Sequence, residues 1–161
     1  MVNPGSVCDV YNNLIKDGAG RHKVYNNVIV RVGSHYPPGH SFGNGITIAK
    51  ETSGGEVMVA NKTIVEPSHA GIRYENDDDR EQLIKNNVIV QPGNQGEHIA
   101  AGRRANVAIS NNFTCPALAP VKFVNPTSDD FRLQADSPPR APGLTGTHLM
   151  IIKSRPDPVS S

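Results

Sequence analysis

Ile84-Lys-Asn-Asn-Val-Ile-Val90 is one of four copies of a short pattern that recurs along the chain. Each copy reads apolar-x-Asn-x-x-[Ile/Thr]-[Val/Cys]. The first asparagines of the copies are Asn26, Asn61, Asn86 and Asn111, so the steps between them are 35, 25 and 25 residues. Such a step indicates one supersecondary unit per repeat, stacked on its neighbours. The other three copies are Val24-Tyr-Asn-Asn-Val-Ile-Val30, Val59-Ala-Asn-Lys-Thr-Ile-Val65 and Ile109-Ser-Asn-Asn-Phe-Thr-Cys115.

A second short segment recurs between these copies and has the alternating pattern of a strand. Its steps are 26, 27 and 22 residues. Short strands at this spacing, with no helical stretch between them, exclude leucine-rich, ankyrin and tetratricopeptide arrays and predict an all-β solenoid. The four copies are Ile46-Thr-Ile48, Ile72-Arg-Tyr74, Ile99-Ala-Ala101 and Val121-Lys-Phe123.

The alternation of side chains along a strand predicts which residues of the second segment face the core. Equivalent residues of successive coils are expected to stack about 4.8 Å apart. The first asparagines, Asn61, Asn86 and Asn111 among them, are therefore expected to form an internal ladder of amides. The residues expected to face inward are Ile46, Ile48, Ile72, Tyr74, Ile99, Ala101, Val121 and Phe123. The residues expected to face outward are Thr47, Arg73, Ala100 and Lys122.

The first full repeat is longer than the others, and its extra length lies in residues 33–44. Insertions often mark the binding face of a repeat protein, so Tyr36 and His40 are candidate substrate-binding residues. Residues 1–143 are expected to form the stack and a C-terminal cap over its last coil, with 144–161 a loosely held tail. A partial copy at residues 10–15 comes too early for a full coil. Either the first coil is degenerate or the chain is the C-terminal part of a longer protein, and we favour the second.

Composition narrows the class of protein. The 16 Lys and Arg residues balance 15 Asp and Glu residues, so no net field favours nucleic acid or a membrane as a partner. Trp is absent, and the 15 Gly and 13 Pro residues suit short strands joined by turns. The N-terminal residues lack the basic and apolar regions of a secretion signal. Cys8 and Cys115 fit no zinc spacing; we expect buried free thiols, with a long-range disulfide as the alternative.

Three features together resemble the pectate-lyase-like superfamily: the repeated coil pattern, the Gly45–Ile48 and Gly71–Tyr74 strands, and the closing Phe123-x-Asn-Pro-x-x-x-Asp-Phe-x-Leu133 with Ser137-Pro138. The resemblance covers roughly residues 7–143 and implies a right-handed parallel β-helix of about four to five coils. It also implies a polysaccharide bound along the outer face of one sheet, and an extracellular or periplasmic location. Lyases, hydrolases, epimerases, tailspikes and adhesins share this architecture, so the resemblance defines the fold more narrowly than the activity.

The outward row of the second segment is the candidate site. Arg73 and Lys122 are expected two coils apart, near 10 Å, with His98 beside the row. Such a cationic groove suits an acidic sugar: Arg73 would bind a uronate carboxylate, and Lys122 or His98 would take the proton α to it. Thr47 and His69 are expected to contact the substrate. The alternative is that Arg73 and Lys122 are solvated charges of an exposed face.

Carboxylates and histidines surround this row. Glu75, Asp77 and Asp78 form an oxygen-rich cluster that would hold calcium and neutralise a substrate carboxylate. The cluster lacks the spacing of a calcium loop, so a solvated acidic turn is preferred and no cofactor is certain. Zinc would need three or four converging histidine nitrogens, and a role in proton transfer or sugar contact is preferred. The histidines expected on this rim are His35, His40, His69 and His98.

Two classes of function follow. The first is a polysaccharide-binding β-helix that acts on an acidic glycan by β-elimination if it is catalytic, because the outward row lacks the paired acids of a hydrolase. The second is a non-catalytic solenoid, namely a fragment, an adhesin segment or a carbohydrate-binding module. The expected partners are an acidic polysaccharide and, through an uncovered first coil, a second copy of the chain.

Overall fold

The structure of the chain is a computed structural model. It describes the backbone of residues 22–25, and it describes residues 27–33, 43–48, 57–75, 81–93, 97–102 and 106–140.

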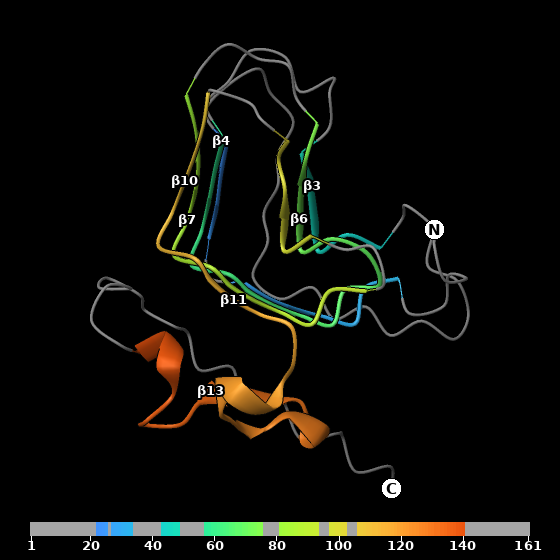
Figure 1. Ribbon diagram of the computed structural model, residues 1–161, viewed down its shortest axis with the longest axis vertical. Coiled ribbons are helices and arrows are strands. Elements are labelled where there is room, and N and C mark those ends of the chain that lie inside the picture. Colours follow the sequence, from blue (N-terminus) through green and yellow to red (C-terminus); the bar gives the residue numbers. More distant parts are fainter. Residues whose placement is uncertain are drawn as a thin grey trace, which may run out of the picture.

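Eleven strands fall into three parallel sheets, in which each strand pairs with the equivalent strands of neighbouring repeats (Figure 1). Sheet A contains, in spatial order, β1 (His22–Tyr25), β4 (Val57–Ala60), β7 (Gln82–Lys85) and β10 (Val107–Ser110). Sheet B contains β2 (Val28–Val30), β5 (Thr63–Val65), β8 (Val88–Val90) and β11 (Phe113–Cys115). Sheet C contains β3 (Ile46–Ile48), β6 (Ile72–Tyr74) and β9 (Ile99–Ala100).

The pairing register reproduces the repeat of the sequence. Val59 pairs with Ile84 and Ile84 with Ile109, which confirms both 25-residue steps. Ile72 pairs with Ile46 on one side and with Ile99 on the other. We call three successive strands, one from each sheet, a coil: β1–β3, β4–β6 and β7–β9 are coils 1 to 3, and β10–β11 begin coil 4. This all-β arrangement of stacked parallel strands is consistent with a parallel β-solenoid.

The turn between sheets A and B depends on a residue in the left-handed region. Asn61, Asn86 and Asn111 have φ values of 55°, 56° and 51° and directly follow β4, β7 and β10. Asparagine adopts this conformation more readily than most residues with a Cβ atom. The recurring asparagine therefore allows the chain to turn the same corner in each coil.

A second left-handed residue follows each of the first three strands of sheet B. Arg31, Glu66 and Gln91 have φ values of 50°, 51° and 51° and follow β2, β5 and β8. The equivalent residue after β11 is Pro116, whose ring holds φ near −65°. Because a proline cannot form this turn, the coil pattern ends there.

The core lies between the three sheets. It contains inward-facing residues of sheet A, such as Val59 and Ile84, of sheet B, such as Ile64 and Ile89, and of sheet C, such as Ile72. All five are at most 1% exposed. For β3, β6 and β9 the inward and outward facing predicted from alternation is confirmed.

The internal amide ladder lies one residue later in each coil than the sequence predicts. Asn86 forms the left-handed turn, whereas the side chain of Asn87 is completely buried. The Asn87 amide nitrogen donates to Asn112 Oδ1 at 2.8 Å and to the carbonyl oxygen of Val59 at 3.1 Å. Its Oδ1 accepts the backbone N–H of Lys62 at 3.0 Å. The ladder prediction is thus right in residue type and step, and wrong in position.

The segment after β11 forms an antiparallel hairpin with three short 3₁₀ helices, and we call it the cap. Its Phe123 and Phe131 rings meet edge to face at 5.3 Å between centroids. These rings join a second hydrophobic cluster with Val65 and Val90 of sheet B. The elements of the cap are η1 (Ala119–Val121), β12 (Phe123–Asn125), η2 (Pro126–Ser128), β13 (Asp130–Leu133) and η3 (Pro138–Arg140).

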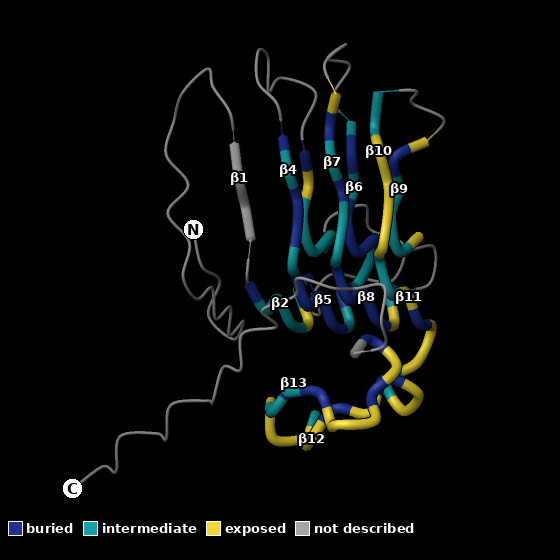
Figure 2. Tube along the Cα trace, turned by 90° about the vertical axis from the view of Figure 1, so that its left-hand side faces the viewer, coloured by how far each residue is buried: buried dark blue, intermediate teal, exposed yellow. Residues whose placement is uncertain are grey.

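The sequence predicts a cap over the last coil. The cap instead packs along the outer face of sheet B, where it contacts coils 2 and 3 as well as Cys115 of the last coil (Figure 2). Both faces of this sheet are consequently buried in coils 2 and 3. An ion pair between Arg31 in coil 1 and Asp129 in the cap ties the cap across the width of the sheet. Ile109 of β10, whose equivalents in coils 2 and 3 are core residues, is 48% exposed at the end of the stack.

Within the described residues, no helix has the length and apolar character needed to cross a lipid bilayer.

Candidate functional site

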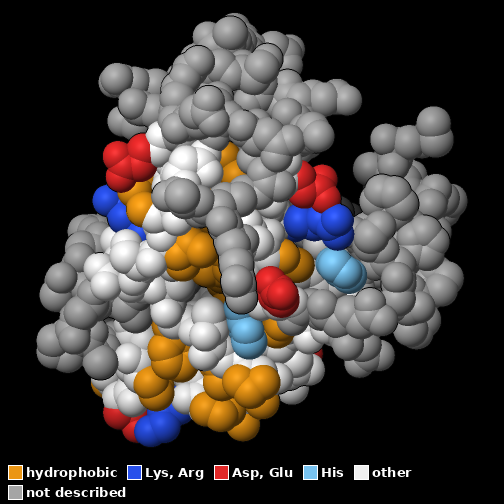
Figure 3. Space-filling view, turned by 45° about the horizontal axis from the view of Figure 1, so that its top comes forward, with side chains coloured by type: hydrophobic (Ala, Val, Ile, Leu, Met, Phe, Trp, Pro, Cys, Tyr) orange, Lys and Arg blue, Asp and Glu red, His pale blue; other side chains and the backbone are white. Residues whose placement is uncertain are grey.

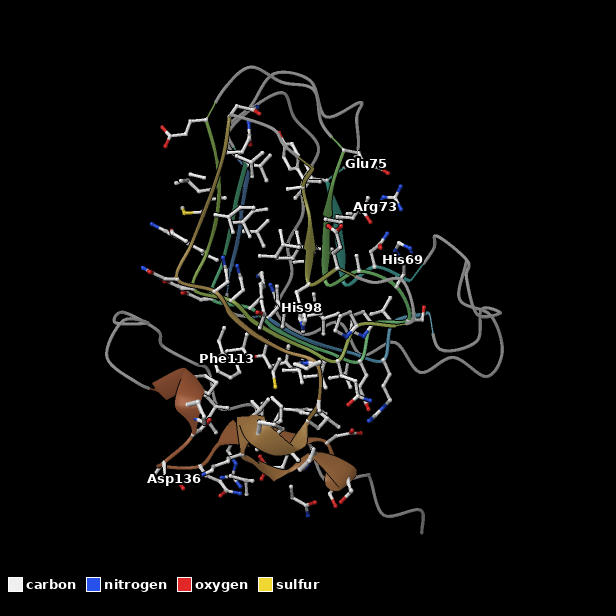
Figure 4. All side chains as sticks on the ribbon, viewed as in Figure 1. His69, Arg73, Glu75, His98, Phe113 and Asp136 are labelled. Atoms are coloured by element: carbon white, nitrogen blue, oxygen red, sulfur yellow. The ribbon has the colours of Figure 1, made fainter. Side chains whose placement is uncertain are left out.

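The outer face of sheet C carries a short polar row that runs across the coils. Thr47 on β3, Arg73 on β6 and Ala100 on β9 are aligned by the parallel pairing of the three strands. Thr47 is exposed, and the Arg73 side chain is 32% exposed. Figure 4 shows Arg73, Glu75 and His69 projecting from the outer side of this sheet. Figure 3 shows acidic, basic and histidine side chains adjoining at the surface on this flank.

Asn44 forms hydrogen bonds with two residues at one end of the row. Its Oδ1 lies 2.8 Å from His69 Nδ1 and accepts the backbone N–H of Ala70 at 3.2 Å. Its amide nitrogen donates to Thr47 Oγ1 at 3.1 Å. Because a carbonyl oxygen only accepts, Nδ1 of a neutral His69 ring carries the proton and Nε2 is left as an acceptor. Asn44 thereby orients two of the residues expected to contact substrate.

Sequence reasoning did not single out Asn44 as a site residue. The available signal is its place directly before the Gly45-Ile46 start of a strand, at the end of the inserted stretch. That position predicts a turn residue as readily as a ligand-orienting one, so the hydrogen bond to His69 in the next coil is visible only in three dimensions.

Arg73 forms an ion pair with Glu75, two residues later on the same face. The Arg73 Nε to Glu75 Oε1 distance is 2.5 Å, and the Glu75 side chain is 40% exposed. Exposed pairs of this kind contribute little to stability, so a stronger anionic ligand can replace the carboxylate. Asp77 and Asp78, which the sequence groups with Glu75 as calcium ligands, lie outside the described residues. Among those that are described, no group of three His, Cys, Asp or Glu side chains converges as a metal site would require.

The placement of Lys122 on the outward row is wrong. Val121 belongs to η1, and Lys122 is the left-handed residue that ends this helix, with φ 56°. Phe123 begins β12, which pairs antiparallel with β13 in the cap. The Lys122 ammonium donates to Asp136, and this hydrogen bond holds the pKa of the Asp136 carboxyl below its usual range. Lys122 therefore lies on a different ladder from Arg73, and the groove expected between them is not formed.

His98 is also turned differently from the expectation. It occupies the position of Gly45 and Gly71 in coils 1 and 2, where an added Cβ atom would meet Ile64 and Ile89 of sheet B. Nε2 of His98 is buried and makes no hydrogen bond. Figure 4 shows His98 on the inner side of the strands, away from the three labelled residues of the outer face. The residue of coil 4 that pairs with Ile89 is the smaller Thr114.

Several expected site residues fall where the structure makes no statement. Tyr36 and His40 of the inserted stretch lie outside the described residues, as do His35 and Cys8. Cys115 is a buried free thiol and contributes to the cluster beneath the cap. The residues that the structure does bring together are Thr47, His69, Arg73 and Glu75, with Asn44 between the first two.

Comparison of the chain with protein-family profiles, with curated protein sequences and with solved structures found no match. The chemical character of the outer face of sheet C is therefore the basis for a functional assignment.

Proposed function

We propose that the chain is a right-handed parallel β-helix of the pectate-lyase-like kind, and that it binds an acidic, uronate-containing polysaccharide along the outer face of sheet C. The observation that carries this proposal is the row of Thr47, Arg73 and Ala100, with His69 oriented beside it. A long polymer needs an extended surface, and a sheet whose strands stack in register provides one.

Each polar group of the row has a role in this proposal. The Arg73 guanidinium binds a uronate carboxylate with paired hydrogen bonds, and Glu75 holds it in place when no ligand is bound. Nε2 of His69 accepts a hydrogen bond from a sugar hydroxyl, with the ring fixed by Asn44. The short side chains of Thr47 and Ala100 leave room on either side of Arg73. Such polymers occur outside the cytoplasm, so the proposal includes an extracellular or periplasmic location.

The proposed activity is binding rather than turnover. Elimination needs a base close to the carbon next to the carboxylate. Of the two bases expected from the sequence, Lys122 is in the cap and His98 has its Nε2 buried. This favours a carbohydrate-binding module or the binding segment of a larger protein over a lyase.

Affinity electrophoresis in gels that contain polygalacturonate, alginate or a neutral glucan tests the proposal. We expect retardation by an acidic polymer, and a loss of about three- to tenfold in affinity for Arg73→Ala, which corresponds to one charged contact of about 1 kcal/mol. Arg132→Ala is the matched control, because Arg132 is equally exposed and pairs with Asp130 two residues earlier, but lies in the cap.

Two further measurements in the same gels test the role of Glu75 and the need for calcium. Glu75→Gln should strengthen retention, because it removes the carboxylate that competes with the ligand. Retention should also be independent of calcium. Equal mobility of the wild type and Arg73→Ala in every acidic gel would contradict the proposal. A rise in absorbance from unsaturated uronate products would show that the protein is a lyase instead.

A further inference from the structure

Lys62 occupies a position that is otherwise held by asparagine. It follows the left-handed residue Asn61 in coil 2, where coils 1, 3 and 4 have Asn27, Asn87 and Asn112. The Lys62 residue is 0% exposed, and its Nζ makes no hydrogen bond. Its backbone is held on the coil 3 side, where its N–H donates to Asn87 Oδ1 and its carbonyl accepts from the N–H of Val88.

Among the residues that the structure describes, no buried acid balances the Lys62 ammonium inside the stack. The other buried polar residues in the described ranges are Asn27, Thr63, Gln82, Asn87 and Ser137, and none of them carries a charge. The inward-facing titratable groups of the strands opposite are the Tyr74 phenol of β6 and the His98 ring before β9. On the strands and turns that flank Lys62, the charged residues Arg31, Glu66 and Lys85 remain partly exposed.

Burial of an amine without a counter-ion favours its neutral form. Desolvation accordingly lowers the pKa of Lys62 from 10.5 to about 7. The residue thus carries a charge in the unfolded chain over the whole physiological range, and changes charge in the folded chain close to neutrality.

We propose that Lys62 is a proton-operated switch in the coil stack: taking up a proton loosens the packing around the turn, and losing it tightens the packing. The geometry of the turn supports this, because Lys62 is completely buried between coils 1 and 3 and its amine makes no hydrogen bond. The change is reversible and involves one proton and no other reactant.

The direction of the pH dependence follows from proton linkage. Between pH 7 and pH 10.5 the unfolded state binds more protons at Lys62 than the folded state, so stability rises with pH across this window. The loss of stability caused by burying the Lys62 amine is fully present below about pH 7 and absent above about pH 10.5. Within the window, each pH unit changes the folding equilibrium constant by up to about tenfold.

Urea denaturation at pH 6, 7, 8 and 9, with the wild type and Lys62→Met compared at each pH, tests the switch. Methionine has a similar length and no charge. The ratio of the two unfolding constants should change by about fiftyfold between pH 7 and pH 9, and by only about twofold between pH 6 and pH 7. Lys85→Met, which removes a partly exposed lysine of β7, is the control and should leave the pH dependence unchanged.

If Lys62→Met does not fold, direct titration of the Lys62 amine in the wild type tests the proposal instead. Nuclear magnetic resonance of ¹³Cε-labelled lysine, with the Lys62 signal assigned by the Lys62→Asn variant, should show one lysine that titrates near neutrality. The proposal is overturned if this signal titrates near pH 10.5 in the folded protein, or if wild type and Lys62→Met lose stability in parallel across the pH range.

Discussion

The turns at Lys62 and at Asn87 have nearly the same backbone and differ in one side chain. The preceding asparagines have φ values of 55° and 56°, and both Lys62 and Asn87 are 0% exposed. The Asn87 amide is satisfied by Val59, Asn112 and the N–H of Lys62, whereas the Lys62 amine has no partner. The backbone path of a coil is therefore set by the left-handed turn and the strand register, while the inward side chain decides whether a polar group is satisfied.

The difference also shows how much a repeat can tolerate. Strands β4 and β5, on either side of Lys62, keep the same register with coil 3 that β7 and β8 keep with coil 4. A stack held by many backbone hydrogen bonds and by a common core can thus absorb one unfavourable side chain.

Of the changes at these turns, removing the hydrogen-bonded amide of Asn87 should have the largest effect on the free energy of unfolding. Asn87→Leu deletes three hydrogen bonds: the Lys62 N–H loses its acceptor, and the Val59 carbonyl and Asn112 Oδ1 each lose one donor. We expect a loss of about 3 kcal/mol in the free energy of unfolding, measured by urea denaturation. Asn112→Leu, at the partly exposed end of the ladder, should cost less. A loss below about 1 kcal/mol for Asn87→Leu would show that the ladder contributes little.

Completing the ladder with an asparagine at position 62 should raise the free energy of unfolding, by less than Asn87→Leu lowers it. Lys62→Asn replaces the unpaired amine by an amide placed as Asn87 is, and should stabilise the protein by about 1–2 kcal/mol at pH 7. Thermal unfolding followed by circular dichroism measures the change. A lower melting temperature would mean that the coil 2 turn has adapted to lysine in a way that asparagine cannot reproduce.

The smallest effect is expected at the left-handed turn itself. Asn86→Ala should cost about 1 kcal/mol, because a Cβ atom without a polar group is disfavoured at a φ of 56°. Asn86→Gly should fall within about 0.5 kcal/mol of the wild type, since glycine adopts this conformation freely. Urea denaturation of the two variants gives both values. A similar cost for Gly and for Ala would indicate that the Asn86 side chain, and not its backbone conformation, determines the stability of the turn.

The sequence predicts the strands of sheets A, B and C well, because their apolar residues recur at a constant step. It fails at Val121-Lys-Phe123, since an antiparallel hairpin has the same two-residue alternation as a strand of the stack. Pro116 is the local signal that separates the two, because the preceding coils need a left-handed residue at its position. The error moves Lys122 from the outer face of sheet C to the cap, and with it the expected catalytic groove.

The sequence places the amide ladder one residue early for a related reason. In an Asn-Asn pair, either residue is suited to a left-handed turn and either can form an internal ladder. The turn interrupts strand alternation, so the parity of the flanking strands does not reveal which asparagine faces inward. Lys62 is the second residue of its pair, and a lysine in a repeat is ordinarily read as a surface residue.

By itself, the sequence determined the repeat length, the all-β class and the facing of Thr47 and Arg73, because these depend on periodicity along the chain. Only the tertiary structure decided that His98 turns inward, that Asn44 orients His69, that the cap covers sheet B and that Lys62 is buried. Each of these depends on which residues of different coils become neighbours, and contacts across 25 or more residues are formed by stacking rather than by local preference.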